Sequence, residues 1–290
     1  MRKGTLYMLT ISVIIPTLNA AKTLARTLSA LLNNAVKPQE ILVIDGLSQD
    51  VTTDIAREFG CAVIVNPLRH TAAARQKGVM AARGEIVAMT DSDCVPSRDW
   101  LGRIQKHFLQ DCELDGVGGP VTLNRPCNRV QVYCAAKAIA DIPEHEEVIT
   151  RKGMRGRFSG ANCAYRRQVV MNVGGFNQSF GAHGGDIDLF WRLVDSGARL
   201  LFDPYLTVEH LGFAKDHVTL ARKSYGYGIA SARLVRSHFP QRRFDLSFYW
   251  KPWIATIQAF LRQDREQHPL CVFIDHFMFA LGRAWGTIEK

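Results

Sequence analysis

Two aspartates that follow an apolar run are the residues of this sequence best suited to chemistry. Residues 86–90 read IVAMT and lead directly into Asp91, Ser92 and Asp93. Carboxylate oxygens of this kind bind Mg²⁺ or Mn²⁺, and such an ion can in turn bind a phosphorylated ligand. A buried strand that delivers carboxylates to its carboxyl end is typical of an open α/β sheet. The triplet therefore predicts an enzyme site if the surrounding sequence forms such a sheet.

The elements that must position these aspartates alternate along the first hundred residues. Continuous apolar runs predict buried strands at residues 11–15, 41–44, 62–65 and 86–91. Apolar residues at helical spacing predict helices over 22–32, 49–59 and 71–82, the second with Ser48 as its N-cap. Strands that alternate with helices imply right-handed crossovers and a mainly parallel sheet. The fold class is therefore α/β.

The carboxyl ends of such strands share one edge, so residues far apart in the sequence should meet there. Pro16 and Thr17, Asp45 and the acidic triplet all follow predicted strands. The chain has no GxGxxG after its first strand and no GxxxxGK[ST], which disfavours dinucleotide and P-loop chemistry. Phosphates would then be held by a metal ion and by side chains.

At this point the sequence resembles the family 2 glycosyltransferases of the GT-A type, over residues 10–212. Residues 12–19 (SVIIPTLN) and 42–45 (LVID), followed by Ser48 and Asp50, resemble the nucleotide-binding strands and turns. The segment around Arg75 resembles the one that approaches the donor diphosphate, and the acidic triplet resembles the DxD motif. Further matches are residues 160–162 (GAN), 174–176 (GGF) and 202–204 (FDP), and His210.

The resemblance implies a GT-A fold, with a Rossmann-like, mainly parallel sheet flanked by helices, and an inverting, nucleotide-sugar-dependent hexosyltransferase-like enzyme. It implies contacts to the donor from Pro16, Thr17, Asn19, Asp45, Arg75, Asp91 and Ser92. It implies a Mn²⁺ or Mg²⁺ ion held by Asp93, Asp91 and His210, and a catalytic carboxylate at Asp186. A UDP-sugar is the favoured donor, with a GDP-sugar as the alternative, and the acceptor is a glycan or a lipid-linked molecule.

Chemistry supports these roles independently. A divalent ion neutralises the charge that develops on a leaving diphosphate. A carboxylate such as Asp186 can accept the proton of the attacking acceptor hydroxyl. If it does so on the face opposite the leaving group, the displacement inverts the anomeric configuration.

The sequence departs from the family pattern in places. Gly185-Asp186 stands where the family usually has Glu-Asp, and Asp45-Gly46 stands where a second acidic residue is frequent. No QxxRW element is present, which favours a single transfer over processive synthesis. The alternatives are a retaining transferase or nucleotidyltransferase on the same fold, and a catalytically silent module that binds nucleotide sugars.

Several candidates also have a purely structural interpretation. Asp186 precedes an amphipathic pattern and can be an N-cap, and Asp188 can form an i,i+4 ion pair with Arg192, so it is left out of the catalytic set. Asp45 before a glycine is also a turn former. Arg75 can be a solvated helix residue and His210 a structural histidine, while the glycines of residues 183–185 suggest a loop that closes over the site.

Composition limits the class of protein and its partners. The 290 residues are 47% hydrophobic and 22% charged, which is ordinary for a soluble globular chain. Seven cysteines without a CxxC pair favour reduced thiols over disulfides or zinc. The formal charge is +9, and residues 211–290 hold 12 Lys and Arg against 6 Asp and Glu. Because no nucleic-acid-binding motif accompanies this charge, anionic lipid or a phosphorylated substrate is the better partner.

We expect a nucleotide-sugar-binding half at residues 9–125, an acceptor and catalytic-base half at 126–212, and a helical C-terminal extension at 213–290. Residues 9–15 are a first strand rather than a signal peptide, and no apolar run reaches the roughly 18 residues of a spanning helix. We therefore expect a cytoplasmic protein, or one peripheral on the inner face of the membrane. Helical apolar spacing at 250–261 and 270–281 predicts helices that pack on the catalytic domain, form a homodimer or lie on an anionic membrane surface.

Overall fold

The computed structural model describes residues 9–123, 125–140, 142–152, 158–241, 253–254, 257–258, 261 and 268–288. The strands are β1 (Ile11–Thr17), β2 (Glu40–Asp45), β3 (Ala62–Val65), β4 (Ile86–Met89), β5 (Cys94–Pro96), β6 (Gly116–Gly118), β7 (Val121–Thr122), β8 (Glu147–Ile149), β9 (Cys163–Arg166), β10 (Leu200–Phe202) and β11 (Val208–His210). The helices are α1 (Leu24–Leu32), α2 (Thr52–Glu58), α3 (Thr71–Ala81), α4 (Trp100–Gln110), α5 (Arg129–Ile139), α6 (Arg167–Asn172), α7 (Gly185–Asp195), α8 (His217–His238) and α10 (Pro269–Ile288), with a short 3₁₀ helix, η1 (Gln178–Phe180).

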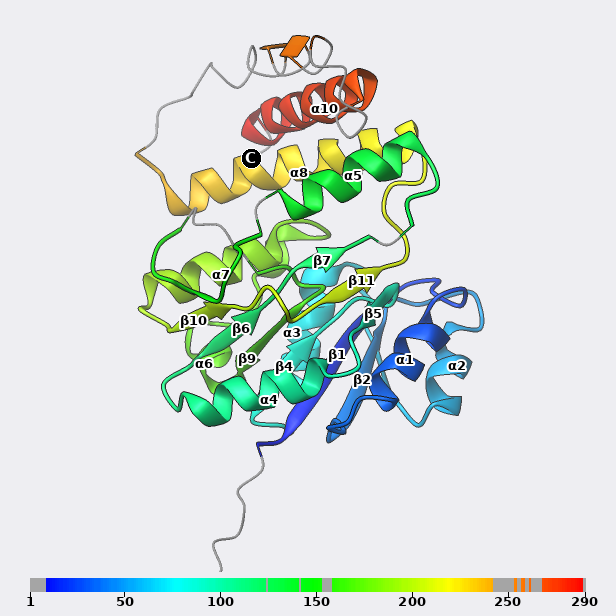
Figure 1. Cartoon of the computed structure of the whole chain (residues 1–290), viewed down its shortest axis with the longest axis vertical. Helices are drawn as coiled ribbons and strands as arrows, with labels where there is room; N and C mark the ends of the chain where they lie inside the picture. Colours follow the sequence, from blue (N-terminus) through cyan, green and yellow to red (C-terminus); the bar gives the residue numbers. More distant parts are fainter. Residues whose placement is uncertain are drawn as a thin grey trace, which may run out of the picture.

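Eight strands form the main sheet in the order β3-β2-β1-β4-β9-β6-β10-β8 (Figure 1). The first four of these strands are mutually parallel, as the alternation of strands and helices predicts. β9 pairs antiparallel with both β4 and β6, and β6 and β10 are again parallel. The predicted α/β fold with a mainly parallel sheet is confirmed. Strands from before and after residue 125, the predicted boundary between the two halves, belong to the same sheet.

Helices cover both faces of this sheet, which explains why its central strands are continuously apolar. On one face, Val13 of β1 belongs to a buried cluster with residues of α1, α2 and α4, including Leu28 and Trp100. On the other face, Ile14 belongs to a second cluster with residues of α3, α6 and α7, including Val79. Burying each such side chain stabilises the fold by about 1.5–3 kcal/mol.

The strands and helices predicted for the first hundred residues are all present, with one error at a helix start. α2 begins at Thr52, with Val51 at its N-cap and no side-chain capping bond, so the prediction that Ser48 caps it is wrong. The Ser48 hydroxyl instead donates to Asp45 Oδ1 at 2.5 Å. The turn after β2 therefore uses Ser48, and the helix starts one turn later.

A small second sheet, in the order β5-β11-β7, lies beside the carboxyl ends of the main strands. β5 follows the acidic triplet directly, and it pairs antiparallel with β11, so that Cys94 stands opposite His210. This pairing brings His210 next to Asp93 across more than a hundred residues of sequence.

The C-terminal helices form a layer over this end of the molecule, with α8 nearer to the sheets than α10 (Figure 1). α8 and α10 cross closely because both carry glycine at the crossing. A Cβ built on Gly228 would stand 2.1 Å from the Phe279 carbonyl oxygen, and one on Gly282 would stand 2.0 Å from that of Tyr225.

A buried aspartate joins the two C-terminal helices to each other and to α5. The carboxylate of Asp275 on α10 accepts hydrogen bonds from Tyr133 and Lys137 of α5 and from Ser224 of α8, each at 2.5 Å. Burial by itself raises the pKa of Asp275, but these donors lower it more, so that the pKa lies below its usual value. The carboxylate therefore remains charged and fixes the layer.

The expected apolar helix at 270–281 is confirmed as the core of α10. Of the helix expected at 250–261, Trp250 and Phe260 lie outside the described residues, while Trp253, Ile254, Ile257 and Leu261 are helical and exposed. Among the described helices, none is both long and apolar enough to cross a membrane.

Candidate active site

The ends of β2, β1 and β4 are neighbours, so they place Asp45, Thr17 and the acidic triplet along one edge, as predicted. Asp45 is 3% exposed. Its carboxylate accepts hydrogen bonds from the Thr17 hydroxyl at 3.3 Å, from the Ser48 amide at 2.9 Å and from the Ser48 hydroxyl. These contacts form an Asx-type turn. If Asp45 also binds a nucleotide sugar, it must do so with the carboxylate lone pairs that are not used in this turn.

Asn19 lies at the rim of the same edge. Its backbone is left-handed, with φ of 51°, a conformation that asparagine tolerates better than most residues. Its amide donates to Ser48 Oγ at 2.8 Å, and its side-chain oxygen accepts from the Gln49 amide at 2.8 Å. Pro16 is buried within β1, in register with Ile44. Asn19 and Ser48 thus join the turns that follow β1 and β2.

Arg75 reaches this edge from α3 and is only 6% exposed, so it is not a solvated helix residue. Its guanidinium donates to Asp91 Oδ1 at 2.8 Å. The group also lies flat against Gly160, where an added Cβ would stand 2.3 Å from Arg75 Cζ. Burial favours a lower pKa for Arg75, but the charges of Asp91 and Asp186 outweigh it, and the pKa is raised. The guanidinium is therefore a permanent cation between two carboxylates.

Asp186 faces Arg75 from the first turn of α7. The N-cap of this helix is Gly184, with φ of 84°, so the N-cap interpretation of Asp186 is wrong. Asp186 Oδ2 accepts a hydrogen bond from the Gly160 amide at 2.9 Å, and Oδ1 accepts from the Ile187 amide at 3.0 Å. The amide of the GAN turn thus fixes one oxygen of this carboxylate.

The neighbouring acidic residue, Asp188, has a different environment. It is 2% exposed and forms an ion pair with Arg192 at 2.7 Å, as its i,i+4 spacing predicts. Its second oxygen lies 2.9 Å from His238 Nε2. Asp188 therefore joins α7 to the end of α8.

Asp93, Cys94 and His210 form the cluster most suited to a metal ion, with one potential ligand atom from each residue within 4.8 Å of the others. His210 Nε2 lies 3.7 Å from Asp93 Oδ1. His210 Nδ1 accepts from the Gly212 amide at 3.0 Å, and its ring stacks on Phe213. The interaction with Gly212 orients Nε2 toward Asp93.

The same loop is held by its backbone at Ser92. The carbonyl of Ser92 accepts a hydrogen bond from Thr27 Oγ1 of α1 at 3.1 Å, and the carbonyl of Asp93 accepts from the Leu211 amide at 2.7 Å. The acidic triplet is therefore anchored on both sides, to α1 and to the segment after β11.

The electrostatics of the cluster fit a cation. Burial raises the pKa of Asp93; His210 opposes this and Asp91 adds to it, so the pKa of Asp93 remains raised. Burial lowers the pKa of His210, which favours the neutral imidazole. Because Nδ1 accepts the Gly212 hydrogen bond, the proton of the neutral ring lies on Nε2, and Nε2 must lose that proton to bind a metal. Burial also holds the pKa of the Cys94 thiol well above its usual value, so it is a poor ligand. The cluster thus offers one carboxylate, Asp93, and the His210 imidazole, which are donor types that suit Mn²⁺ or Mg²⁺. Asp91 lies outside the cluster, and its Oδ1 pairs with Arg75 at 2.8 Å.

Two features of the site have no reliable signal in the sequence. The Gly160 amide that holds Asp186 is a backbone group, and its position depends on how β9 is inserted in the sheet. Cys94 is visible beside the acidic triplet, but only its pairing with His210 places it in the cluster.

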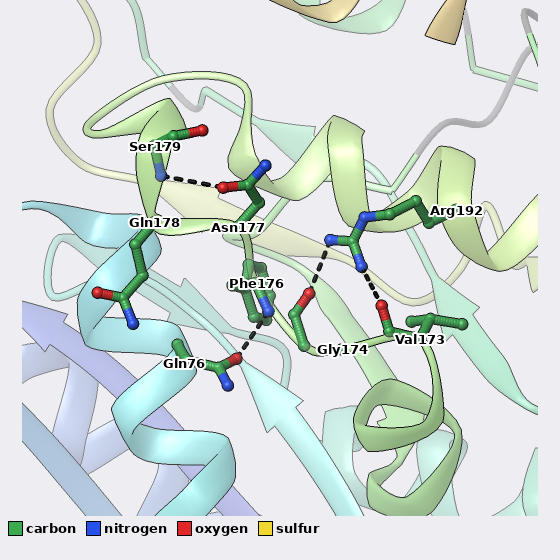
Figure 2. A pocket seen from close by; sticks show the side chains of 9 residues that line it. Gln76, Val173, Gly174, Phe176, Asn177, Gln178, Ser179 and Arg192 are labelled. Carbon is green, nitrogen blue, oxygen red and sulfur yellow. Dashed lines mark hydrogen bonds between the residues drawn. The ribbon is translucent and has the colours of Figure 1, made fainter. Parts of the chain in front are cut away.

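A separate depression of about 500 Å³ lies between α3 and α7 (Figure 2). Gln76 Oε1 accepts from the Phe176 amide at 2.7 Å, and Arg192 donates to the carbonyls of Val173 and Gly175 at 2.6 and 2.7 Å. These bonds hold the GGF loop of residues 174–176 in place. None of the predicted site residues lines this depression.

Comparison with solved structures identifies the fold class as GT-A. The mannosyltransferase PcManGT from Pyrobaculum calidifontis, solved with GDP-Man and Mn²⁺, superimposes with a TM-score of 0.63 and 18% identity, over 98% of this chain and 88% of that one. Glucosyl-3-phosphoglycerate synthase from Mycobacterium tuberculosis, solved with Mn²⁺, UDP and glucosyl-3-phosphoglycerate, gives a TM-score of 0.57 and 19% identity, over 78% of this chain and 79% of that one.

The model of the glycosyl transferase family 2 matches residues 12–174, and the chain belongs to this family. It is 31% identical over 236 residues to a pre-mycofactocin glycosyltransferase of Mycobacterium tuberculosis, covering 79% of this chain and 48% of that protein. It is also 31% identical over 206 residues to the glycosyltransferase AglE of Haloferax volcanii, covering 66% of this chain and 64% of that protein. The chain thus spans about half to two thirds of the length of these curated relatives.

Proposed function

We propose that this protein transfers a glycosyl group from a nucleotide-diphosphate sugar to an acceptor hydroxyl, with inversion at the anomeric carbon and with Asp186 as general base. The observation that carries the proposal is the Asp186 carboxylate. It is fixed by the Gly160 amide at 2.9 Å and is near the Arg75–Asp91 ion pair. A carboxylate held in this way, at the edge of the sheet where nucleotides bind, is suited to accept a proton from an acceptor.

The proposed reaction is a single displacement. The acceptor oxygen bonds to the anomeric carbon and its proton passes to the Asp186 carboxylate, while the bond from the anomeric carbon to the diphosphate oxygen breaks. The electron pair of that bond leaves with the diphosphate. Asp93, Asp91 and His210 would hold a Mn²⁺ or Mg²⁺ ion, which when bound supplies Lewis-acid neutralisation of the diphosphate charge.

We assign the nucleotide to the edge formed by Pro16, Thr17, Asn19 and Asp45, with Pro16 shaping the turn from inside β1. Arg75 contributes its permanent charge, and Ser92 contributes through the anchored loop on which it lies. The solved relatives named above contain GDP-Man in one case and UDP in the other, together with Mn²⁺. Both donor classes are therefore candidates for this chain.

Ligand-induced thermal stabilisation tests the donor and the metal site together. The wild type, Asp93→Ala and Asp54→Ala are melted with a panel of UDP- and GDP-sugars, with and without Mn²⁺. Asp54 is a matched control, because it is an exposed aspartate on α2 that pairs only with Arg57 in the described part of the chain. A donor at about 100 times its dissociation constant adds about 2.7 kcal/mol to the free energy of unfolding.

We expect one donor class to stabilise the wild type and Asp54→Ala in a Mn²⁺-dependent way and to lose this effect in Asp93→Ala. If no donor stabilises the wild type, the proposed donor binding is refuted. A donor that stabilises the wild type but is never turned over would identify a silent module that binds nucleotide sugars. The product then decides the reaction class. Retention of the donor configuration would overturn the inverting mechanism, and nucleotide transfer would overturn glycosyl transfer.

We also propose that the outer face of the C-terminal layer lies on an anionic lipid surface, which would bring a lipid-linked acceptor to the site. Leu281 and Trp285 of α10 are 48% and 57% exposed, and Trp253 packs on Phe273 and Phe277 with ring centroids 5.2 and 6.5 Å apart. Exposed aromatic residues in a segment with excess positive charge are typical of an interfacial helix.

Sedimentation with anionic and neutral liposomes at low salt tests this contact. We expect the wild type to bind anionic vesicles and the double variant Leu281→Glu/Trp285→Glu to lose binding. Leu109→Glu is the control, because Leu109 is a similarly exposed residue on α4, at 52%. If the wild type does not sediment with anionic vesicles, the proposed membrane contact is refuted. A wild-type dimer that the same double variant dissociates would assign the face to a second copy of the chain.

A further inference from the structure

One face of α8 is turned toward the candidate active site. A Cβ built on Gly226 would stand 2.6 Å from the His183 ring, and the Cβ of Ala230 would stand 2.9 Å from one built on Gly184. The Tyr227 ring meets the His183 ring edge-on, with centroids 4.9 Å apart. This face of α8 therefore covers the loop that leads to Asp186.

Lys223 lies one turn earlier on the same face, since residues three and four apart are neighbours on a helix surface. Its side chain is half-buried, and within the described residues no hydrogen bond or ion pair engages its ammonium. The titratable groups that its charge affects are Asp93 and His210 near the end of the small sheet, His183 in the loop, and Cys134 on α5.

The charge of Lys223 acts to lower the pKa of each of these four groups. Burial has the largest effect on the pKa of Asp93, His210 and His183, and the ammonium adds a lowering contribution to each. The ammonium therefore lies near residues from several separate elements. The Lys223 ammonium is not among the buried side-chain atoms without a hydrogen bond in the described chain, so it is open to solvent and accessible to a ligand.

The chemistry of the surroundings selects the ligand. Asp93 faces His210, and a divalent ion bound by these two residues would neutralise the negative charge of the Asp93 carboxylate. With that ion bound, Lys223 and Arg75 would leave the crevice with an excess of positive charge, which attracts an anion. Lysine commonly binds phosphate groups, and its ammonium then acts as a point charge.

We propose that Lys223 binds a phosphate group in this crevice, either the diphosphate of the donor or a phosphate carried by the acceptor. This inference rests on the proposed function and deepens it. Lys223 lies outside the region 12–174 that the family model matches. The C-terminal extension then contributes a ligand-binding residue to the site, in addition to covering it.

Titration calorimetry tests the proposal with a readout that does not depend on turnover. Wild type, Lys223→Met, Lys223→Arg and the control Arg222→Met are titrated with UDP and GDP in the presence of Mn²⁺. Arg222 is the exposed neighbour on the same helix, with the same charge. Orthophosphate is then titrated into each protein saturated with nucleotide and Mn²⁺, and thermal melts of the free proteins check folding.

If Lys223 binds the donor diphosphate, we expect Lys223→Met to reduce the affinity for the more tightly bound nucleotide by about ten-fold or more. This is the effect of losing one charged hydrogen bond. Lys223→Arg and Arg222→Met should keep affinities near that of the wild type. If Lys223 binds an acceptor phosphate, nucleotide affinity stays unchanged and orthophosphate binds the saturated wild type but not Lys223→Met.

Two negative outcomes are distinguishable. If the wild type and Lys223→Met bind both nucleotide and orthophosphate equally, the role of Lys223 is refuted and the proposed function stands. If the wild type binds neither nucleotide, the proposed function fails, and the Lys223 proposal fails with it.

Discussion

Replacing Asp186 by asparagine separates its proposed catalytic role from its structural one. The carboxamide has nearly the same shape, and its oxygen can still accept the Gly160 hydrogen bond that the carboxylate accepts at 2.9 Å. What the variant loses is the negative charge, the ability to take up a proton, and the hydrogen bond that the second oxygen accepts from the Ile187 amide at 3.0 Å. We therefore expect the fold and donor binding to survive, and proton transfer to be lost.

The two effects differ enough in size to be told apart. Weakening the hydrogen bond from Gly160 and losing the one from Ile187 cost about 1 kcal/mol of stability each. General-base catalysis contributes about 10²- to 10⁴-fold in rate. At about 1.36 kcal/mol for each factor of ten, this is about 2.7–5.5 kcal/mol in the activation barrier. The expected loss in kcat thus exceeds any effect that a small loss of stability can produce in a folded enzyme.

The assay follows release of UDP or GDP from saturating donor, with Mn²⁺ present and water as the acceptor, and calorimetry measures the donor dissociation constant. The control is Asp195→Asn at the other end of α7, where the carboxylate is 55% exposed and pairs with Lys152. We expect kcat to fall by about 100-fold or more in Asp186→Asn only, with donor affinity changed by less than about three-fold.

Two results would refute this reasoning. A kcat within about three-fold of the wild type would exclude Asp186 as the base, because the expected effect is at least about a hundred-fold. A weaker donor affinity with an unchanged kcat would assign Asp186 to ligand binding, since only uniform binding would then be lost.

Two further predictions concern the C-terminal layer. Because the pKa of Asp275 is lower in the folded state, its stabilisation is complete above its unfolded pKa, about 3.9, and is lost as the pH falls below that value. Melting curves from pH 6 to 3 should therefore decline less steeply in Asp275→Asn than in the wild type, and parallel curves would contradict the assignment. Gly282→Ala should destabilise the protein by about 1–3 kcal/mol, because the new Cβ meets the Tyr225 carbonyl. Gly102→Ala on α4, where the nearest atom is 3.8 Å away, should stabilise it by about 0.5–1 kcal/mol, and equal effects of the two substitutions in chemical denaturation would exclude a tight helix crossing.

The first half of the fold is predictable because its signals are local. β1 to β4 are apolar runs buried on both faces, and α1 to α3 are helical patterns between them, so periodicity and length identify each one. The ends of helices are less predictable, because a capping side chain can bond elsewhere. Ser48 is an example, since it bonds to Asp45 and leaves α2 to begin later.

The second half required the tertiary structure. β9 is inserted antiparallel between β4 and β6, a pairing that no local pattern in its four residues specifies. The same holds for α8, whose glycines look unfavourable for a helix until their contacts with α10 are known.

The sequence by itself determined the fold class, the acidic triplet and the candidacy of Asp186, because residue type and spacing are sufficient to recognise a strand end and a motif. Only the tertiary structure decided how the groups meet. It paired Arg75 with Asp91, placed the Gly160 amide on Asp186, and brought His210 beside Asp93. The physical reason is that these contacts depend on strand pairing and on backbone donors contributed by distant segments, and neither is encoded by the residues that make the contact.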